Sequence, residues 1–292
     1  MSVKSLPLAV SLLFLPLLLG CIHKQSPTNN HSAQPTTVAA EKVTTVGFPS
    51  GMHPVLHNGM LMGGLLNGKI VDNTTMRKAL TGTEEYRCYT QTALVGRGYA
   101  QSVEDTDFGY YVTVGDKPKD NSPKSPLATA TGDTPPQDAS HATSFKWDIA
   151  VCGEWNAIPR IPSKGNSRLP EIQQAVRREL ARHGITKPQV NIRSVWEIDL
   201  DGDGTQEMVV DALTKNFADE LFKRATPGDY ACVILMQKQR QDWTSAVIDG
   251  EFFTKASLSD KSQNDSSIIY STQGFYDADG DGAIEILVQA ML

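Results

Sequence analysis

The chain has 292 residues, with 27 Lys and Arg against 33 Asp and Glu, which gives a formal net charge of -6. A protein of this sign lacks the basic surface that nucleic-acid binding requires, so the composition argues against a nucleic-acid partner. Four cysteines are present, none in C-x-x-C spacing, which argues against a zinc ribbon or a thioredoxin-like redox site.

The N-terminal segment is typical of a secreted protein. Lys4 precedes an apolar run over 8–19, which is too short to span a bilayer comfortably and matches the hydrophobic region of a signal peptide. The run ends in Leu-Leu-Gly-Cys at 18–21, a sequence that resembles the lipobox of bacterial lipoproteins. The alternative is an ordinary signal peptide followed by a chance cysteine.

The lipobox resemblance implies a lipid anchor. In that family the signal peptide, here 1–20, is removed, and the cysteine, here Cys21, receives acyl chains such as palmitate. Each buried CH₂ contributes ~0.8 kcal/mol, so several chains would hold the protein permanently at a membrane. Ile22 stands where an Asp would signal inner-membrane retention in that family. If the host is Gram-negative, we therefore expect the outer membrane, with the protein facing the periplasm or the surface. The Ser-, Thr-, Asn- and Pro-rich segment 21–45 reads as a disordered tether.

The next region, 46–162, is expected to be β-rich. Asn67-Gly68 is a hairpin signal within a glycine-punctuated stretch. Aromatic and β-branched residues predict strands over 86–90, 108–114 and 145–151. The Pro-, Ser- and Thr-rich segment 117–144 reads as a low-complexity insertion.

Cys88 and Cys152 could form a disulfide in an oxidising envelope, whereas Cys232 lies in an apolar run and reads as a small buried residue.

The region 163–292 begins with the clearest predicted helix, over 170–183. Ile172, Val176 and Leu180 recur at helical spacing, Pro170 suits the first turn, and Gly184 suits the stop. Strands are expected over 190–198, 207–213, 229–237, 243–253, 268–276 and 285–292. The fold class is therefore α+β and β-dominated: a mostly antiparallel sheet with one clear helix, in a second unit that begins near residue 165.

Two nine-residue stretches share the pattern D-x-D-G-D-G-x-x-E. The first begins at Asp199, the second begins at Asp277, and each runs directly into a predicted strand. Four carboxylates in one short turn repel one another unless a cation lies between them. Calcium prefers six to eight hard oxygen ligands, so the pattern predicts two calcium ions. The alternative is a pair of acidic turns that bind no metal.

The spacing distinguishes between two kinds of calcium loop. An EF-hand closes with a Glu at position 12, but that position holds Val210 and Val288 here. The pattern instead resembles the loops of integrin-like FG-GAP and VCBS repeats. In that family, side chains at positions 1, 3, 5 and 9 and the carbonyl at position 7 bind calcium. The resemblance covers about 190–292, and a propeller would need at least four such blades. It implies the ligands Asp199, Asp201, Asp203, Thr205 (carbonyl) and Glu207, then Asp277, Asp279, Asp281, Ala283 (carbonyl) and Glu285.

No catalytic residues are assigned from the sequence. His53 and His57 are four apart, but Pro54 between them argues against a helical zinc motif, and neither a G-x-S-x-G nor a P-loop is present. Two hypotheses remain. The first is a non-catalytic envelope lipoprotein stabilised by calcium, serving adhesion or interaction with a protein or glycan. The alternative is an envelope hydrolase with an unassigned active site in 46–162.

Overall fold

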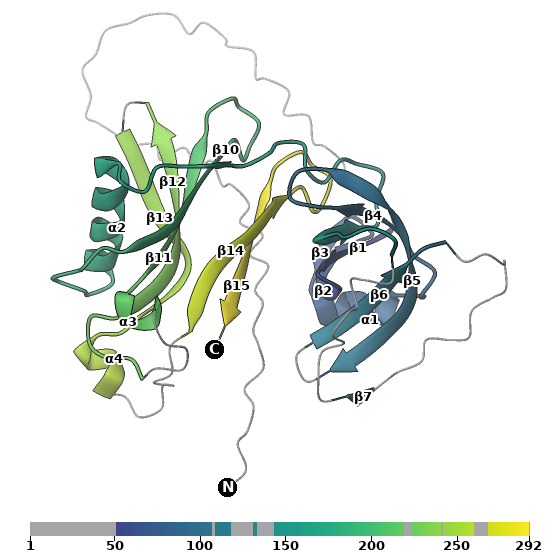
Figure 1. Ribbon diagram of the computed structural model, residues 1–292, viewed down its shortest axis with the longest axis horizontal. Helices are drawn as coiled ribbons and strands as arrows, with labels where there is room; N and C mark the ends of the chain where they lie inside the picture. Colours follow the sequence, from purple (N-terminus) through teal and green to yellow (C-terminus); the bar gives the residue numbers. More distant parts are fainter. Residues whose placement is uncertain are drawn as a thin grey trace, which may run out of the picture.

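The computed structural model describes residues 51–106, 109–117, 131–132, 143–218, 224–240, 242–259 and 268–291. The expected signal peptide, Cys21, the tether 21–45 and most of the expected insertion lie outside these residues. The described chain forms a β-barrel, a five-stranded sheet covered by one long helix, and a two-stranded hairpin that lies between them (Figure 1).

The barrel is built from antiparallel strands of the first half of the chain. Its six closing strands pair in the order β1-β8-β4-β5-β6-β2, and β2 pairs back with β1. Closure leaves no free edge among these six strands, while β3 extends β2 and β7 pairs in parallel with β5. The bounds are β1 Met52–His57, β2 Met60–Leu66, β3 Lys69–Val71, β4 Glu85–Tyr89, β5 Leu94–Thr106, β6 Gly109–Gly115, β7 Thr131–Gly132 and β8 Ile149–Val151.

Side chains fill the barrel because alternate residues of each strand point inward. Leu56, Tyr86 and Ala150 belong to the interior cluster, while their neighbours on the outer face pack elsewhere. A short helix, α1 (Asn73–Ala79), adds Met76 to this core. Its N-cap is Asp72, whose side chain accepts a hydrogen bond from the Thr75 amide at 2.7 Å.

The five-stranded sheet is antiparallel in the order β13-β12-β11-β10-β9. Its central strand β11 is buried along its whole length, because the helix α2 (Pro170–Arg182) covers one face and the hairpin covers the other. The bounds are β9 Ser163–Lys164, β10 Ile192–Ile198, β11 Glu207–Leu213, β12 Tyr230–Gln239 and β13 Asp242–Phe252, with short helices α3 Lys215–Ala218 and α4 Lys255–Ser259 at one end.

The helix α2 forms as its sequence predicts. Pro170 occupies the first turn, and the chain leaves the helix through Gly184, whose φ of 88° is the left-handed conformation that glycine adopts without penalty. Ile172, Val176 and Leu180 are fully buried against the sheet. Complete burial of side chains of this size contributes about 1.5–3 kcal/mol each.

The hairpin consists of β14 (Ile269–Tyr276) and β15 (Glu285–Met291). It is apolar on both faces. Phe275, Ile286 and Val288 pack on the sheet, whereas Tyr276 and Leu287 pack on the outer wall of the barrel. The hairpin therefore joins the two larger units, as Figure 1 shows.

The β-dominated, mostly antiparallel fold agrees with the sequence prediction. Two particulars were wrong. The last two strands form a separate hairpin rather than extending one sheet. The strand expected over 145–151 is reduced to β8. The disulfide that the sequence left open between Cys88 and Cys152 is not formed, because both are free thiols. Cys88 stands opposite Ala150, so Cys152 is a diagonal neighbour, at a separation of roughly 7–8 Å that is too long for a bond.

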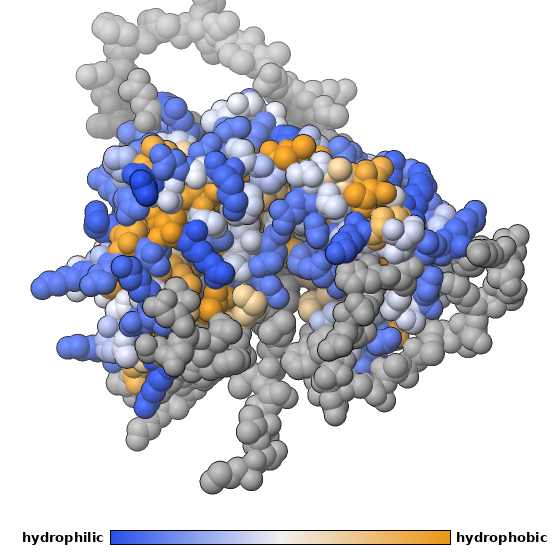
Figure 2. All heavy atoms as spheres, viewed as in Figure 1, coloured by the Kyte–Doolittle hydropathy of each residue, from blue (hydrophilic) through white to orange (hydrophobic). Residues whose placement is uncertain are grey.

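On the face shown in Figure 2, hydrophobic residues gather mainly on the left, with smaller groups at the top and right, and hydrophilic residues lie between them. The most exposed large hydrophobic residues among the described ones are Ile161, Leu94 and Ile70. Isolated residues of this kind are common on soluble surfaces and do not by themselves mark a binding face. None of the helices in the described ranges is long and apolar enough to cross a membrane.

Candidate metal centre

Both acidic stretches form tight connections between antiparallel strands. Loop 1 (199–207) joins β10 to β11, and loop 2 (277–285) joins β14 to β15. Each loop ends with its glutamate at the first position of the following strand. The local strand-turn-strand arrangement expected from the sequence is therefore present twice, once in the sheet and once in the hairpin.

The two loops have the same internal hydrogen bonds. In each, the carboxylate at position 1 accepts from the amides of both glycines, and the carboxylates at positions 3 and 5 each accept from an amide two residues later. The glutamate at position 9 accepts from the amide of position 2, at 2.7 Å in loop 1 and 2.6 Å in loop 2. The other pairs agree to within 0.1 Å. The pattern thus specifies one backbone conformation.

The glycines explain why the conformation needs this sequence. Gly202 and Gly280 both have φ of 81°, while Gly204 and Gly282 have φ of 86° and 90°. A side chain at these φ values costs about 1–2 kcal/mol. With glycine at both positions the chain turns back sharply, and the carboxylates gather on the inner side of the turn.

The carboxylate oxygens lie close enough to share one ion. In loop 1, oxygens of Asp199, Asp201 and Asp203 all lie within 4.8 Å of one another, and in loop 2 the same holds for Asp277, Asp279 and Glu285. Two oxygens bound to one calcium at 2.3–2.6 Å can be at most about 5 Å apart. Glu207 and Asp281 are the predicted ligand side chains that fall outside these two groups. The hard-oxygen donor set fits calcium.

The carbonyl ligands that the sequence predicts at position 7 belong to Thr205 and Ala283. The amide of each donates to the aspartate at position 5, at 2.6 Å for Thr205 and 2.7 Å for Ala283. The same peptide segment is therefore held alike in both loops. The side chains differ, which is expected when only the backbone oxygen is used.

The two loops differ in burial. Asp277 and Asp279 are each only 4% exposed, while Asp201 and Asp203 are exposed. Burial raises the pKa of Asp277 and of Asp279 to about 6, and it raises the pKa of Glu285 to about 9. Burial also raises the pKa of Glu207, and the negative charges of the three aspartates in loop 1 raise it further. Without a cation, loop 2 holds its negative charge at the greater cost.

The buried side of loop 2 rests on the segment 152–162, which we call the linker because it connects the barrel to the sheet. Trp155 donates from Nε1 to the Asp277 carbonyl oxygen at 2.8 Å, and the Asp277 amide donates to the Ala157 carbonyl at 2.9 Å. The Trp155 carbonyl accepts in turn from Tyr89 and Arg87 of β4. Loop 2 is therefore tied to the barrel wall, and Arg160 of the same linker lies between loops 1 and 2.

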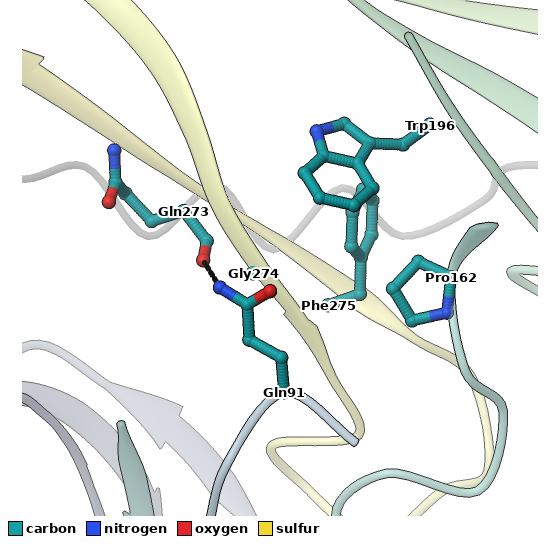
Figure 3. Close-up of a pocket in the computed structure, with 6 residues that line it drawn as sticks. All are labelled: Gln91, Pro162, Trp196, Gln273, Gly274 and Phe275. Atoms are coloured by element: carbon teal, nitrogen blue, oxygen red, sulfur yellow. Dashed lines mark hydrogen bonds between the residues drawn. The ribbon is translucent and has the colours of Figure 1, made fainter. Parts of the chain in front are cut away.

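The cavities around this joint are small. Figure 3 shows one where Gln91 donates to the Gln273 carbonyl and where Trp196 meets Phe275 edge-on, with ring centroids 5.9 Å apart. Its volume of about 10 Å³ leaves room for roughly one water molecule. A second cavity of the same volume lies between His57 and Glu285. These spaces are packing defects at a joint rather than pockets for a substrate.

A larger cavity of about 550 Å³ lies beside Gly184–Lys187 and Phe253–Lys255, and no residue of either loop lines it. The residues described along its wall include no histidine, cysteine or carboxylate. The histidines of β1 have other contacts. His53 Nδ1 lies 2.6 Å from the Cys152 carbonyl, so this nitrogen carries the proton, and burial lowers the pKa of His57 to about 4.

Comparisons with protein-family models, with curated proteins and with solved structures each found no match to this chain. The two loops are therefore the features of this chain that point to a function. Sequence reasoning identified every loop residue but missed Trp155 as a support and Arg160 as a bridge. No local pattern marks either residue, because their partners lie 122 or 39 positions away along the chain.

Proposed function

We propose that this protein is a non-catalytic, lipid-anchored protein of the bacterial cell envelope that binds two structural calcium ions. The ligands would be the side chains at positions 1, 3, 5 and 9 and the carbonyl at position 7 of each loop, as in FG-GAP and VCBS repeats. The ions would stabilise a folded unit that serves adhesion or interaction. The lipobox at Cys21 supports the anchoring. It would also place the loops outside the cytoplasm, where calcium is concentrated enough to fill weak sites.

The observation that carries the calcium proposal is the repetition of one loop geometry. Two stretches in different sheets form the same set of carboxylate-to-amide hydrogen bonds. Each carboxylate that uses one oxygen to hold the backbone keeps its other lone pairs for an ion. Four carboxylates in one turn repel one another when no cation lies between them, so the occurrence of the same spacing in both loops favours cation binding.

Calcium titration of the full-length protein in detergent tests the proposal. Extracellular modules bind with Kd of roughly 10⁻⁴–10⁻³ M, and isothermal calorimetry should give two ions per chain. At about 100-fold excess over Kd, each independent site adds ~2.7 kcal/mol to stability. Thermal melts with calcium and with chelator should then differ by several degrees.

The combined variant Asp203→Ala plus Asp281→Ala serves as the control, because it removes one central ligand from each loop. Its melting temperature should no longer respond to calcium. A wild-type protein whose melting temperature and heat of titration are indifferent to calcium would refute the proposal.

The anchor is tested separately. Mass spectrometry of protein from the membrane fraction should detect an acylated N-terminal peptide that begins at Cys21. The variant Cys21→Ser should release the protein from the membrane fraction without changing its calcium response. A wild-type N-terminal peptide without acyl chains would contradict the lipoprotein assignment and leave the calcium proposal standing.

A further inference from the structure

Arg160 lies between the two loops and contacts the backbone of both. Its Nε donates to the Asp199 carbonyl, and its Nη2 donates to the carbonyls of Leu200 at 3.0 Å and Gly282 at 2.6 Å. Arg160 is half-buried, and its Nη1 lies 3.0 Å from the position where a Cβ on Gly202 would stand. Its rigid fork allows one side chain to hold three carbonyls at once.

The carbonyls that Arg160 holds belong to peptide groups that also orient proposed ligands. In loop 1, the Asp199 carbonyl shares its peptide group with the Leu200 amide, which donates to Glu207 Oε2. In loop 2, the Gly282 carbonyl shares its peptide group with the Ala283 amide, which donates to Asp281 Oδ1. A continuous path of hydrogen bonds therefore runs from a ligand of loop 1, through Arg160, to a ligand of loop 2.

A second link reinforces the first. The Ile284 amide of loop 2 donates to the Leu200 carbonyl of loop 1 at 2.8 Å, the same oxygen that accepts from Arg160. Leu200 and Ile284 are both buried in one apolar cluster. Displacement of either loop would therefore disturb a shared oxygen and a shared core.

We propose that Arg160 is a positioning residue that couples the two calcium sites, so that filling one loop raises the affinity of the other. This inference depends on the calcium proposal above. The first ion restricts the peptide groups of its loop, and the hydrogen bonds of Arg160 restrict the second loop in turn. The second loop then loses less conformational freedom when it binds its own ion. Coupling between sites in proteins typically changes affinity by about 5- to 150-fold, and we expect at least fivefold here.

The coupling is measured by emptying one loop at a time in the full-length protein. Asp201→Asn plus Asp203→Asn disables loop 1, and Asp279→Asn plus Asp281→Asn disables loop 2. Asn keeps the side-chain oxygen that accepts from the backbone amide, so the turns should remain folded. Calorimetric calcium titrations give two stepwise association constants for the intact protein and one for each single-site protein. The coupling factor is the product of the first two constants divided by the product of the two single-site constants.

Three variants assign the coupling to Arg160. Arg160→Met removes the donors, and the coupling factor should fall toward one, leaving only the part that the Ile284–Leu200 hydrogen bond and the shared apolar cluster carry. Arg160→Lys keeps the charge without the planar fork and should restore only part of the coupling. Arg177→Met changes an exposed arginine on α2 and should leave the factor at its wild-type value. Circular dichroism confirms that each variant is folded, and Arg160→Lys carries the test if Arg160→Met does not fold.

The outcomes separate the inference from the proposal beneath it. Two bound ions with a coupling factor near one in the wild type would overturn the coupling and leave the calcium function intact. An unchanged factor in both Arg160 variants would overturn the role of Arg160. No calcium binding by the wild type would instead remove the function on which the inference depends.

Discussion

Loops 1 and 2 have the same sequence pattern, the same glycine conformations and matching hydrogen bonds, yet they lie in different surroundings. Loop 1 is at an exposed end of the sheet, whereas loop 2 is pressed against the linker and the barrel. The local sequence sets the arrangement of the carboxylates, and the tertiary contacts set how much free energy it costs to keep them charged. A cation in loop 2 would offset buried negative charge and would also secure the joint between two units.

The largest expected effect is a difference between the loops in calcium-dependent stability. The loop 2 variant Asp279→Asn plus Asp281→Asn should lose most of the rise in melting temperature that calcium produces, because it removes the ion from the buried site. The loop 1 variant Asp201→Asn plus Asp203→Asn should lose less. Calorimetric melts with calcium and with chelator make the comparison.

The same melts contain an internal check at pH 8. In the presence of chelator, the loop 2 variant should melt higher than the wild type. A neutral amide replaces the buried Asp279 carboxylate, and another removes the charge of the exposed Asp281 that repels it. Equal responses from the two loops would show that burial does not control the effect.

The second prediction concerns pH in the absence of calcium. Because the folded-state pKa values of Asp277 and Asp279 are about 6 and that of Glu285 is about 9, the folded state binds more protons than the unfolded state from about pH 4 to pH 9. Stability therefore falls as pH rises through this range. Saturating calcium should suppress the fall, so the gap between the two melting temperatures should widen from pH 5 to pH 8. A constant gap would contradict the pKa shifts.

The third prediction uses two glycines of loop 2 with similar φ. An alanine at either 280 or 282 has about 1–2 kcal/mol of backbone strain. Gly280→Ala should destabilise more, because its Cβ would lie 2.8 Å from Trp155 Cδ2, whereas nothing lies within 4 Å of the Cβ position at Gly282. Urea denaturation measures both variants. Equal losses would mean that Trp155 moves aside freely.

The smallest expected effect is at position 7, where the loops differ in side chain. Thr205→Ala converts loop 1 to the residue that loop 2 carries as Ala283. Since only the carbonyl is a proposed ligand, the change in stability should stay within about 0.5 kcal/mol, and the calcium affinity of loop 1 should be unchanged. A large loss of affinity would indicate that the Thr205 hydroxyl takes part.

The features that the sequence predicts best are those set by residues close together in the chain. The α2 helix, the strand pairs β10–β11 and β12–β13, and both loops follow from local periodicity and spacing. Strand β5 was not predicted, because Gly96 and Gly98 resemble turn signals. The structure explains them by close packing: a Cβ at Gly96 would lie 2.6 Å from the Phe145 ring, and one at Gly98 would lie 2.2 Å from Val114 Cγ1.

Features that depend on distant contacts could not be predicted in the same way. Closure of the barrel requires β1 to pair with both β2 and β8, and no local pattern specifies the second pairing. Arg160 lies in Ile-Pro-Arg-Ile-Pro, a segment that reads as an irregular connection. The carbonyls of Asp199 and Leu200 come near that of Gly282 only after the sheet and the hairpin have come together.

The two-faced hairpin has a consequence for how the protein is assembled. The sheet face around Val209 and Val233 and the barrel wall around Val55 and Tyr89 both need the hairpin as cover, and the hairpin follows both units in the chain. During synthesis, the residues of both surfaces are present before those of the hairpin that covers them, and exposed apolar surface of this kind promotes aggregation. The hairpin can therefore pack only after both units have been synthesised, and a chain truncated before β14 should expose both apolar surfaces.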